Sequence, residues 1–128
     1  MLAITSVYAA LLTLLFLALS ARVITYRRSR QLGLGDEGDR DLLRRMRAQA
    51  NCAEYAPLGV VLLALVELQG TAVWGVHALG GMLTVGRLAH GWGFSRRPMI
   101  MPLRVGGMAL TLTMLALSAL VLLVGGLL

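Results

Sequence analysis

The stretch Arg44–Leu58, RRMRAQANCAEYAPL, joins a basic segment of the chain directly to an apolar one. It still carries Asn51 and Glu54 where the apolar residues begin. On a helix with about 100° between successive residues, Arg47, Asn51 and Glu54 fall within roughly 60° of one another. Three polar groups therefore share one helix face at the point where the helix would enter a membrane, which is typical of a binding site.

The composition is typical of an integral membrane protein. Of the 128 residues, 58% are hydrophobic and only 14% are charged, and the mean hydropathy is +0.78. The apolar residues come in long blocks, which favours helices over the alternating pattern of barrel strands. All twelve basic residues are arginines, nearly all between residues 22 and 47 or 96 and 104. This clustering indicates membrane orientation, and no basic face with interleaved aromatic residues points to nucleic acid as a partner.

The apolar blocks predict an all-α, four-helix membrane bundle that forms a single domain over residues 1–128. We expect transmembrane helices at about 2–28, 40–69, 72–95 and 102–127, each long enough to cross roughly 30 Å of hydrocarbon. The glycine- and aspartate-rich segment 31–39 is the expected loop after the first helix, with Asp39 or Asp41 capping the second. The lone Cys52 excludes an intramolecular disulfide and is expected to be a small buried residue. We expect no metal site.

The positive-inside rule places both arginine-rich loops on the cytoplasmic side and both termini on the opposite side. The polar groups expected in that half of the bundle are Arg27, Arg47, Asn51, Glu54, Arg87, His90 and Arg104. Two interpretations stay open. Ion pairs of Glu54 with Arg47 or with Arg87 could simply fix the bundle. Alternatively, the guanidinium groups could line a cleft for a small polyanion, since arginine binds carboxylates bidentately and favours a thiolate over a thiol.

Residues 47–58, RAQANCAEYAPL, closely resemble the second-helix signature of the MAPEG family, the membrane-associated proteins of eicosanoid and glutathione metabolism. The four-helix layout, the arginine-rich end of the first helix and Gly86-Arg87-Leu88 in the third agree with this resemblance. It covers essentially the whole chain and looks closest to the short bacterial members. It implies a homotrimer in a bacterial inner membrane, with glutathione held between neighbouring subunits.

The resemblance also implies a set of glutathione-site residues: Arg27, Arg47, Gln49, Asn51, Glu54 and Tyr55. Arg87 and His90 join them as candidates from the polar cleft that the residues predict, and for His90 two interpretations stay open, a hydrogen-bond donor or a spectator. Gln49 would reach the site from the adjacent subunit, and Arg27 resembles the family arginine that meets a glutathione carboxylate. Arg104, at the start of the fourth helix, is the candidate catalytic residue and would stabilise the glutathione thiolate. Where the leukotriene and prostaglandin synthases of the family have tyrosines in the third helix, this chain has His90 and Phe94.

Two functions follow as expectations. The first is a glutathione transferase or peroxidase that acts on a hydrophobic small molecule, an electrophile arriving from the bilayer. The alternative is a non-catalytic scaffold or a protein that interacts with membrane lipids, which the lost tyrosine hydroxyl at Phe94 favours. A channel is disfavoured because no polar stripe follows the full length of any predicted helix.

Overall fold

The computed structural model describes residues 1–128 as four α-helices. They are α1 (Ala3–Arg30), α2 (Arg40–Leu68), α3 (Val73–Ser95) and α4 (Met101–Leu127). Each helix end lies within two residues of the predicted one, and there are no strands. The all-α prediction is therefore confirmed.

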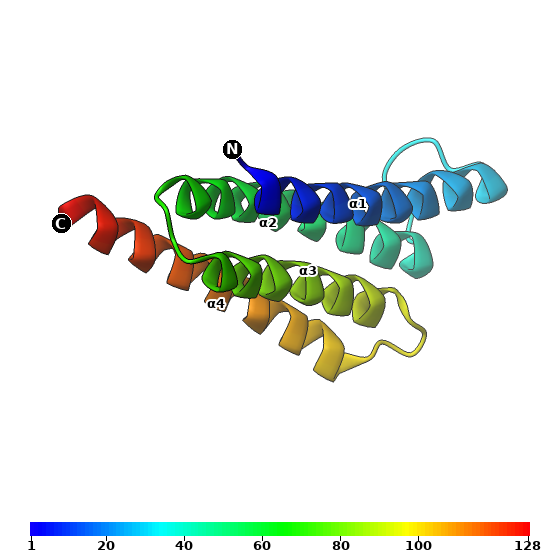
Figure 1. The fold of residues 1–128 in the computed structure, drawn as a ribbon. Coiled ribbons are helices and arrows are strands. Elements are labelled where there is room, and N and C mark those ends of the chain that lie inside the picture. Colours follow the sequence, from blue (N-terminus) through cyan, green and yellow to red (C-terminus); the bar gives the residue numbers. More distant parts are fainter.

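The helices pack as a bundle in which α2 and α3 are the inner pair. α1 packs on α2 and α3, α4 packs on α3 and α2, and α1 and α4 make no contact with each other. The α1–α2 and α3–α4 loops lie at one end of the bundle, and the two chain termini lie at the other (Figure 1). We call the end with these two loops the arginine-rich end, because every arginine except Arg87 lies between residues 22 and 47 or between residues 96 and 104, in these loops and the helix ends beside them.

Three helices, α1, α2 and α4, are long and apolar enough to cross a membrane. The third predicted span, α3, is not among them, although its 23 residues would reach about 34 Å at 1.5 Å per residue. Two histidines, Arg87 and several glycines lower its hydropathy. Since Arg87 is only 1% exposed, its charge lies within the bundle and is shielded from lipid, which makes a helix of this composition compatible with a membrane.

The carboxylate of Asp39 joins α1 to α2 at the arginine-rich end. It accepts hydrogen bonds from the backbone N–H of Asp41 at 2.9 Å and of Leu42 at 3.1 Å, and from the Tyr26 hydroxyl at 2.8 Å. The Leu42 N–H and the Tyr26 hydroxyl hold the pKa of this loop carboxyl below its usual value, because both stabilise the charged form. Asp39 is therefore the N-cap of α2, whereas Asp41 pairs with Arg97 of the α3–α4 loop at 2.9 Å.

At the opposite end, Glu67 of α2 caps the first turn of α1. Its carboxylate accepts from the backbone N–H of Ile4 at 3.0 Å and of Thr5 at 2.7 Å, and from the Thr5 hydroxyl at 2.6 Å. The residue before α1 is Leu2, whose side chain offers no capping oxygen. A carboxylate from a neighbouring helix thus satisfies amide groups that the local sequence leaves open.

Gly86 and Gly107 let α3 and α4 approach closely. A Cβ added to Gly107 would lie 2.5 Å from the Gly86 carbonyl oxygen, so no larger residue fits there without a shift of backbone. Gly86 directly precedes Arg87, and Gly107 lies one turn before Thr111, so this close approach fixes how the side chains of Arg87 and Thr111 face each other.

Candidate ligand-binding site

A groove of about 580 Å³ lies between α2 and α4, with α3 as its floor. This volume is within the range of small-molecule sites, about 300–1,000 Å³. Its polar and aromatic lining comes from Arg47, Asn51, His90, Phe94 and Arg104, and its apolar lining from Met101, Val105, Met108, Ala109 and Leu112 of α4. The polar groups lie near the arginine-rich end, and the apolar residues of α4 that follow Arg104 continue away from it.

Arg87 is the buried centre behind this groove. Its Nε donates to Thr111 Oγ1 at 2.9 Å, and its Nη1 donates to the side-chain oxygen of Asn51. The guanidinium carbon lies 5.5 Å from the centre of the Tyr55 ring, a cation–π distance. Arg87 therefore ties α3 to α2 and α4 through neutral partners, and no carboxylate balances its charge.

This contact also decides what Asn51 offers to a ligand. Its side-chain oxygen accepts from Arg87, so its amide nitrogen, with two N–H donors, is the group left for the groove that Asn51 lines. A donor held by a buried cation is suited to binding an anion.

Glu54 pairs with Arg47 and not with Arg87, which decides between the two partners that the sequence left open. The oxygen–nitrogen distance is 3.8 Å, and the two side chains are 50% and 53% exposed. An ion pair of this length and exposure contributes little to stability. Arg47 can therefore exchange Glu54 for a ligand carboxylate at low cost.

Arg104 lies over the ring of Phe94, with its guanidinium carbon 4.2 Å from the ring centre. Its Nη1 donates to the sulfur of Met99 at 3.1 Å, and no carboxylate pairs with it. The ring of His90, 4% exposed, lies 5.5 Å from that of Phe94. Phe94, expected to mark only a lost hydroxyl, thus has a role of its own, because its ring supports the candidate catalytic arginine.

Two predicted site residues lie apart from the groove, on the α1 side of α2. Arg27 donates from Nη1 to the Gly35 carbonyl at 2.8 Å and from Nη2 to the sulfur of Met46 at 3.4 Å. Gln49 donates to the Ser20 hydroxyl at 3.5 Å. A single chain therefore brings Arg47, Asn51, His90 and Arg104 together, places Glu54, Tyr55 and Arg87 in contact with members of that set, and leaves Arg27 and Gln49 elsewhere.

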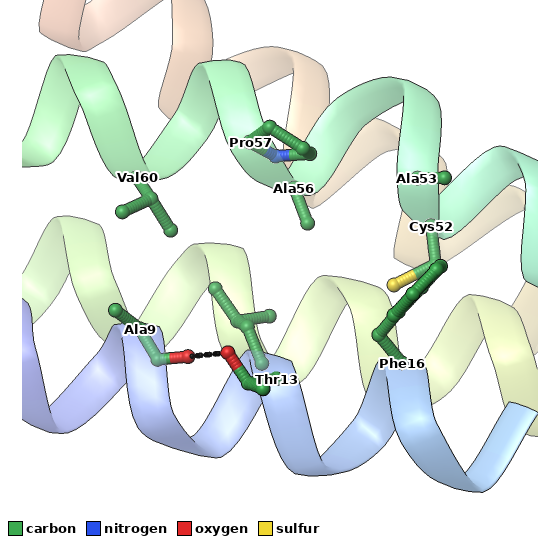
Figure 2. A pocket seen from close by; sticks show the side chains of 9 residues that line it. Ala9, Thr13, Phe16, Cys52, Ala53, Ala56, Pro57 and Val60 are labelled. Carbon is green, nitrogen blue, oxygen red and sulfur yellow. Dashed lines mark hydrogen bonds between the residues drawn. The ribbon is translucent and has the colours of Figure 1, made fainter. Parts of the chain in front are cut away.

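The α1–α2 face holds a second, mostly apolar pocket of about 410 Å³. Cys52 and Phe16 lie at one end of it and Val60 at the other (Figure 2). The one polar side chain, Thr13, donates its hydroxyl to the Ala9 carbonyl at 2.8 Å. Cys52 is 2% exposed, which confirms that it is a small buried residue. This pocket offers apolar surface and no charged group.

Sequence reasoning missed the part that Thr111 plays. Its hydroxyl donates to the Gly107 carbonyl one turn earlier at 2.9 Å, as expected for a membrane helix, and it also accepts from Arg87. The sequence feature that could have indicated this contact is the position of Thr111 four residues after Gly107, since small residues at that spacing let a neighbouring helix come close.

Comparison with known proteins agrees with this architecture. The sequence model of the MAPEG family matches residues 5–124, nearly the whole chain. The inner membrane protein YecN of Escherichia coli K12 is 35% identical over 94 residues, which cover 73% of this chain and 72% of YecN. YecN of Escherichia coli O6:H1 matches with the same identity and coverage. The family resemblance carried by residues 47–58 is thus confirmed, and this chain is an integral membrane protein that belongs to the MAPEG family.

Proposed function

We propose that this protein binds glutathione in the α2–α4 groove and uses it as a transferase or peroxidase on a hydrophobic electrophile. The observation that carries the proposal is the lining of the groove, in which cationic and N–H donor groups at one end adjoin apolar side chains of α4. Glutathione supplies two carboxylates and a thiol, and an apolar co-substrate would need the remaining surface. Family membership supports the same ligand.

The proposed roles follow from the contacts of each residue. Arg47 binds a glutathione carboxylate in place of Glu54, and the amide of Asn51, held by Arg87, donates a second hydrogen bond. Arg104 would stabilise the glutathione thiolate, and each unit by which it lowers the thiol pKa corresponds to about 1.4 kcal/mol. His90 lines the same groove and is a further donor for the ligand. The apolar side chains of α4 exclude water and hold the electrophile near the sulfur.

The assembly that we propose is a homotrimer in which two subunits complete each site. Arg27 and Gln49 lie on the side of α2 that faces away from the groove, and they would reach a site only in a neighbouring subunit. The apolar α1–α2 pocket lies on that same side. Only 24 of 128 residues are buried within one chain, so much apolar surface is left for lipid and for other subunits. By analogy with YecN, the proposed location is the bacterial inner membrane, with the arginine-rich end in the cytoplasm.

One observation favours the alternative of a non-catalytic scaffold. Arg104 already contacts the Phe94 ring and the Met99 sulfur. These contacts favour a scaffold, because Arg104 would have to keep or exchange them in order to bind a thiolate. A scaffold could keep glutathione binding while losing turnover. Binding and activity are therefore tested separately.

The test of binding is calorimetric titration of glutathione into the purified, detergent-solubilised protein and its Arg47→Ala variant. We expect the variant to bind about tenfold or more weakly, because a hydrogen bond to a charged group contributes about 1.5–3 kcal/mol. Arg40→Ala is the matched control, since Arg40 is an exposed α2 arginine outside the groove. The proposal fails if the wild-type protein does not bind glutathione, or if Arg40→Ala weakens binding as much as Arg47→Ala.

A further inference from the structure

A third groove, of about 420 Å³, lies between α1 and α3, away from the proposed glutathione site. α1 and α4 do not touch, so this groove and the α2–α4 groove lie on different sides of the bundle. On α3, Trp92 lines the α1–α3 groove and His90 lines the other. Two residues apart on a helix, their side chains point about 160° away from each other. The two grooves can therefore be occupied independently.

The α1–α3 groove is polar at one end only. Leu15, Ala18 and Leu19 of α1 and Leu88 of α3 form its apolar part. Nearer to the arginine-rich end come Arg22, three residues after Leu19 on α1, and Arg96, which directly follows the end of α3. The groove is thus apolar along most of its length and carries guanidinium groups at the arginine-rich end.

The charges at that end have no acidic partner. Arg45 donates from Nη1 to the backbone carbonyl of Arg22 at 3.5 Å, and Arg96 lines the same groove as Arg22, so the three like charges lie near one another. The ion pairs of the chain use Asp41 and Glu54 and involve none of these three arginines. Like charges gathered at a membrane surface are costly unless an anion lies among them.

The aromatic residues beside Arg45 and Arg96 indicate how deep these arginines lie in the membrane. The guanidinium carbon of Arg96 lies 3.6 Å above the Trp92 ring, and that of Arg45 lies 4.7 Å from the Tyr26 ring. Trp92 is 56% exposed, and exposed tryptophans of membrane proteins lie at the level of the lipid headgroups. Cation–π stacking occupies one face of the Arg96 guanidinium and leaves its N–H edge able to donate to a ligand.

We infer that the α1–α3 groove is a binding site for an anionic phospholipid. Arg22 and Arg96 hold the phosphate, Arg45 adds its charge from beside Arg22, and one acyl chain lies along Leu15, Ala18 and Leu88. Charge complementarity favours an anionic lipid, because the headgroup of a zwitterionic lipid would add a positive charge to a site that already has three arginines. The inference does not depend on glutathione binding.

The experiment uses native mass spectrometry of the full-length protein in detergent with either phosphatidylglycerol or phosphatidylcholine of matched acyl chains. We expect the wild-type protein to retain phosphatidylglycerol in preference to phosphatidylcholine. Arg22→Gln/Arg96→Gln should weaken that retention about tenfold or more, since charge-assisted hydrogen bonds to phosphate are lost. The control Arg28→Gln/Arg40→Gln removes the same charge from two exposed arginines outside the groove and should behave as wild type.

A second variant tests the apolar part and leaves every charge in place. Leu88 is 49% exposed, so Leu88→Trp fills the groove without disturbing the core and should also lower retention. The inference is overturned if both lipids are retained equally, if the control loses lipid as the double variant does, or if Leu88→Trp retains lipid as wild type. If the variants lose their oligomeric state and not their lipid, which the same spectra show as a change of mass, the groove is a contact between copies of this chain. That result would overturn the lipid site.

Discussion

The guanidinium of Arg87 donates to the side-chain oxygen of Asn51, across the interface between α3 and α2. Arg87 is 1% exposed and Asn51 lines the α2–α4 groove. A buried cation thus sets the orientation of a groove-lining amide, and the stability of the bundle and the geometry of the proposed site depend on the same contact.

Removing the cation alone should destabilise the protein. We expect Arg87→Met to lower the free energy of unfolding by about 1–3 kcal/mol, because the buried Thr111 hydroxyl and the partly buried Asn51 oxygen both lose their donor. The double variant Arg87→Met/Asn51→Leu should recover part of that loss, since apolar groups then replace both partners. Denaturant unfolding in detergent measures both values, and a single variant as stable as wild type would contradict the role assigned to Arg87.

Thr111 should be needed as the acceptor for Arg87. Thr111→Val keeps the shape of the side chain but leaves the Arg87 Nε–H without its 2.9 Å partner, which is expected to cost about 1–3 kcal/mol. Thr113→Val, at an exposed position of the same helix, is the matched control and should leave stability unchanged. Thermal unfolding in detergent compares the two, and equal midpoints would show that the hydroxyl of Thr111 contributes nothing.

Arg104 should affect turnover more than binding if the protein is an enzyme. With Arg104→Ala, we expect the pKa of the glutathione thiol in the complex to rise and kcat to fall about tenfold for each unit of that rise. Phe94→Leu should have a smaller effect in the same direction, because it removes the ring 4.2 Å from the guanidinium. Ultraviolet titration of the bound thiolate and activity on a panel of electrophiles provide the measurements. Unchanged binding together with no activity in the wild-type protein would favour the scaffold.

Asp39 should make stability depend on pH in the acid range. Its pKa is lower in the folded protein, because the Leu42 N–H and the Tyr26 hydroxyl stabilise the carboxylate. Its contribution is therefore complete above the unfolded-state pKa of about 3.9 and is lost as the pH falls through the lower folded value. Asp39→Asn should be less stable than wild type near neutral pH and should approach it in acid, whereas Glu37→Gln, in the same loop, should follow the wild-type curve. A constant gap between wild type and Asp39→Asn across the pH range would contradict this prediction.

Much of the candidate site could be anticipated from the single helix that contains Arg47, Asn51 and Glu54. Their common face follows from helical spacing, and the structure places Arg47 and Asn51 in the α2–α4 groove and pairs Glu54 with Arg47. The partner of Glu54 could not be decided in advance, because Arg47 and Arg87 were both within possible reach. The support that Phe94 gives to Arg104 was also hidden, since the two residues belong to different helices.

The sequence by itself determined the number of helices, their ends within two residues and the membrane class, and it narrowed the α2 cap to Asp39 or Asp41, because these depend on apolar block length and on neighbours along the chain. Only the tertiary structure decided that Glu67 caps α1, that Arg87 joins Asn51 to Thr111, and that Arg27 and Gln49 lie on the far side of α2 from the groove. Each of these depends on how far one helix is rotated and shifted against another. That register is set by close packing, as at Gly86 and Gly107, and local sequence does not specify it.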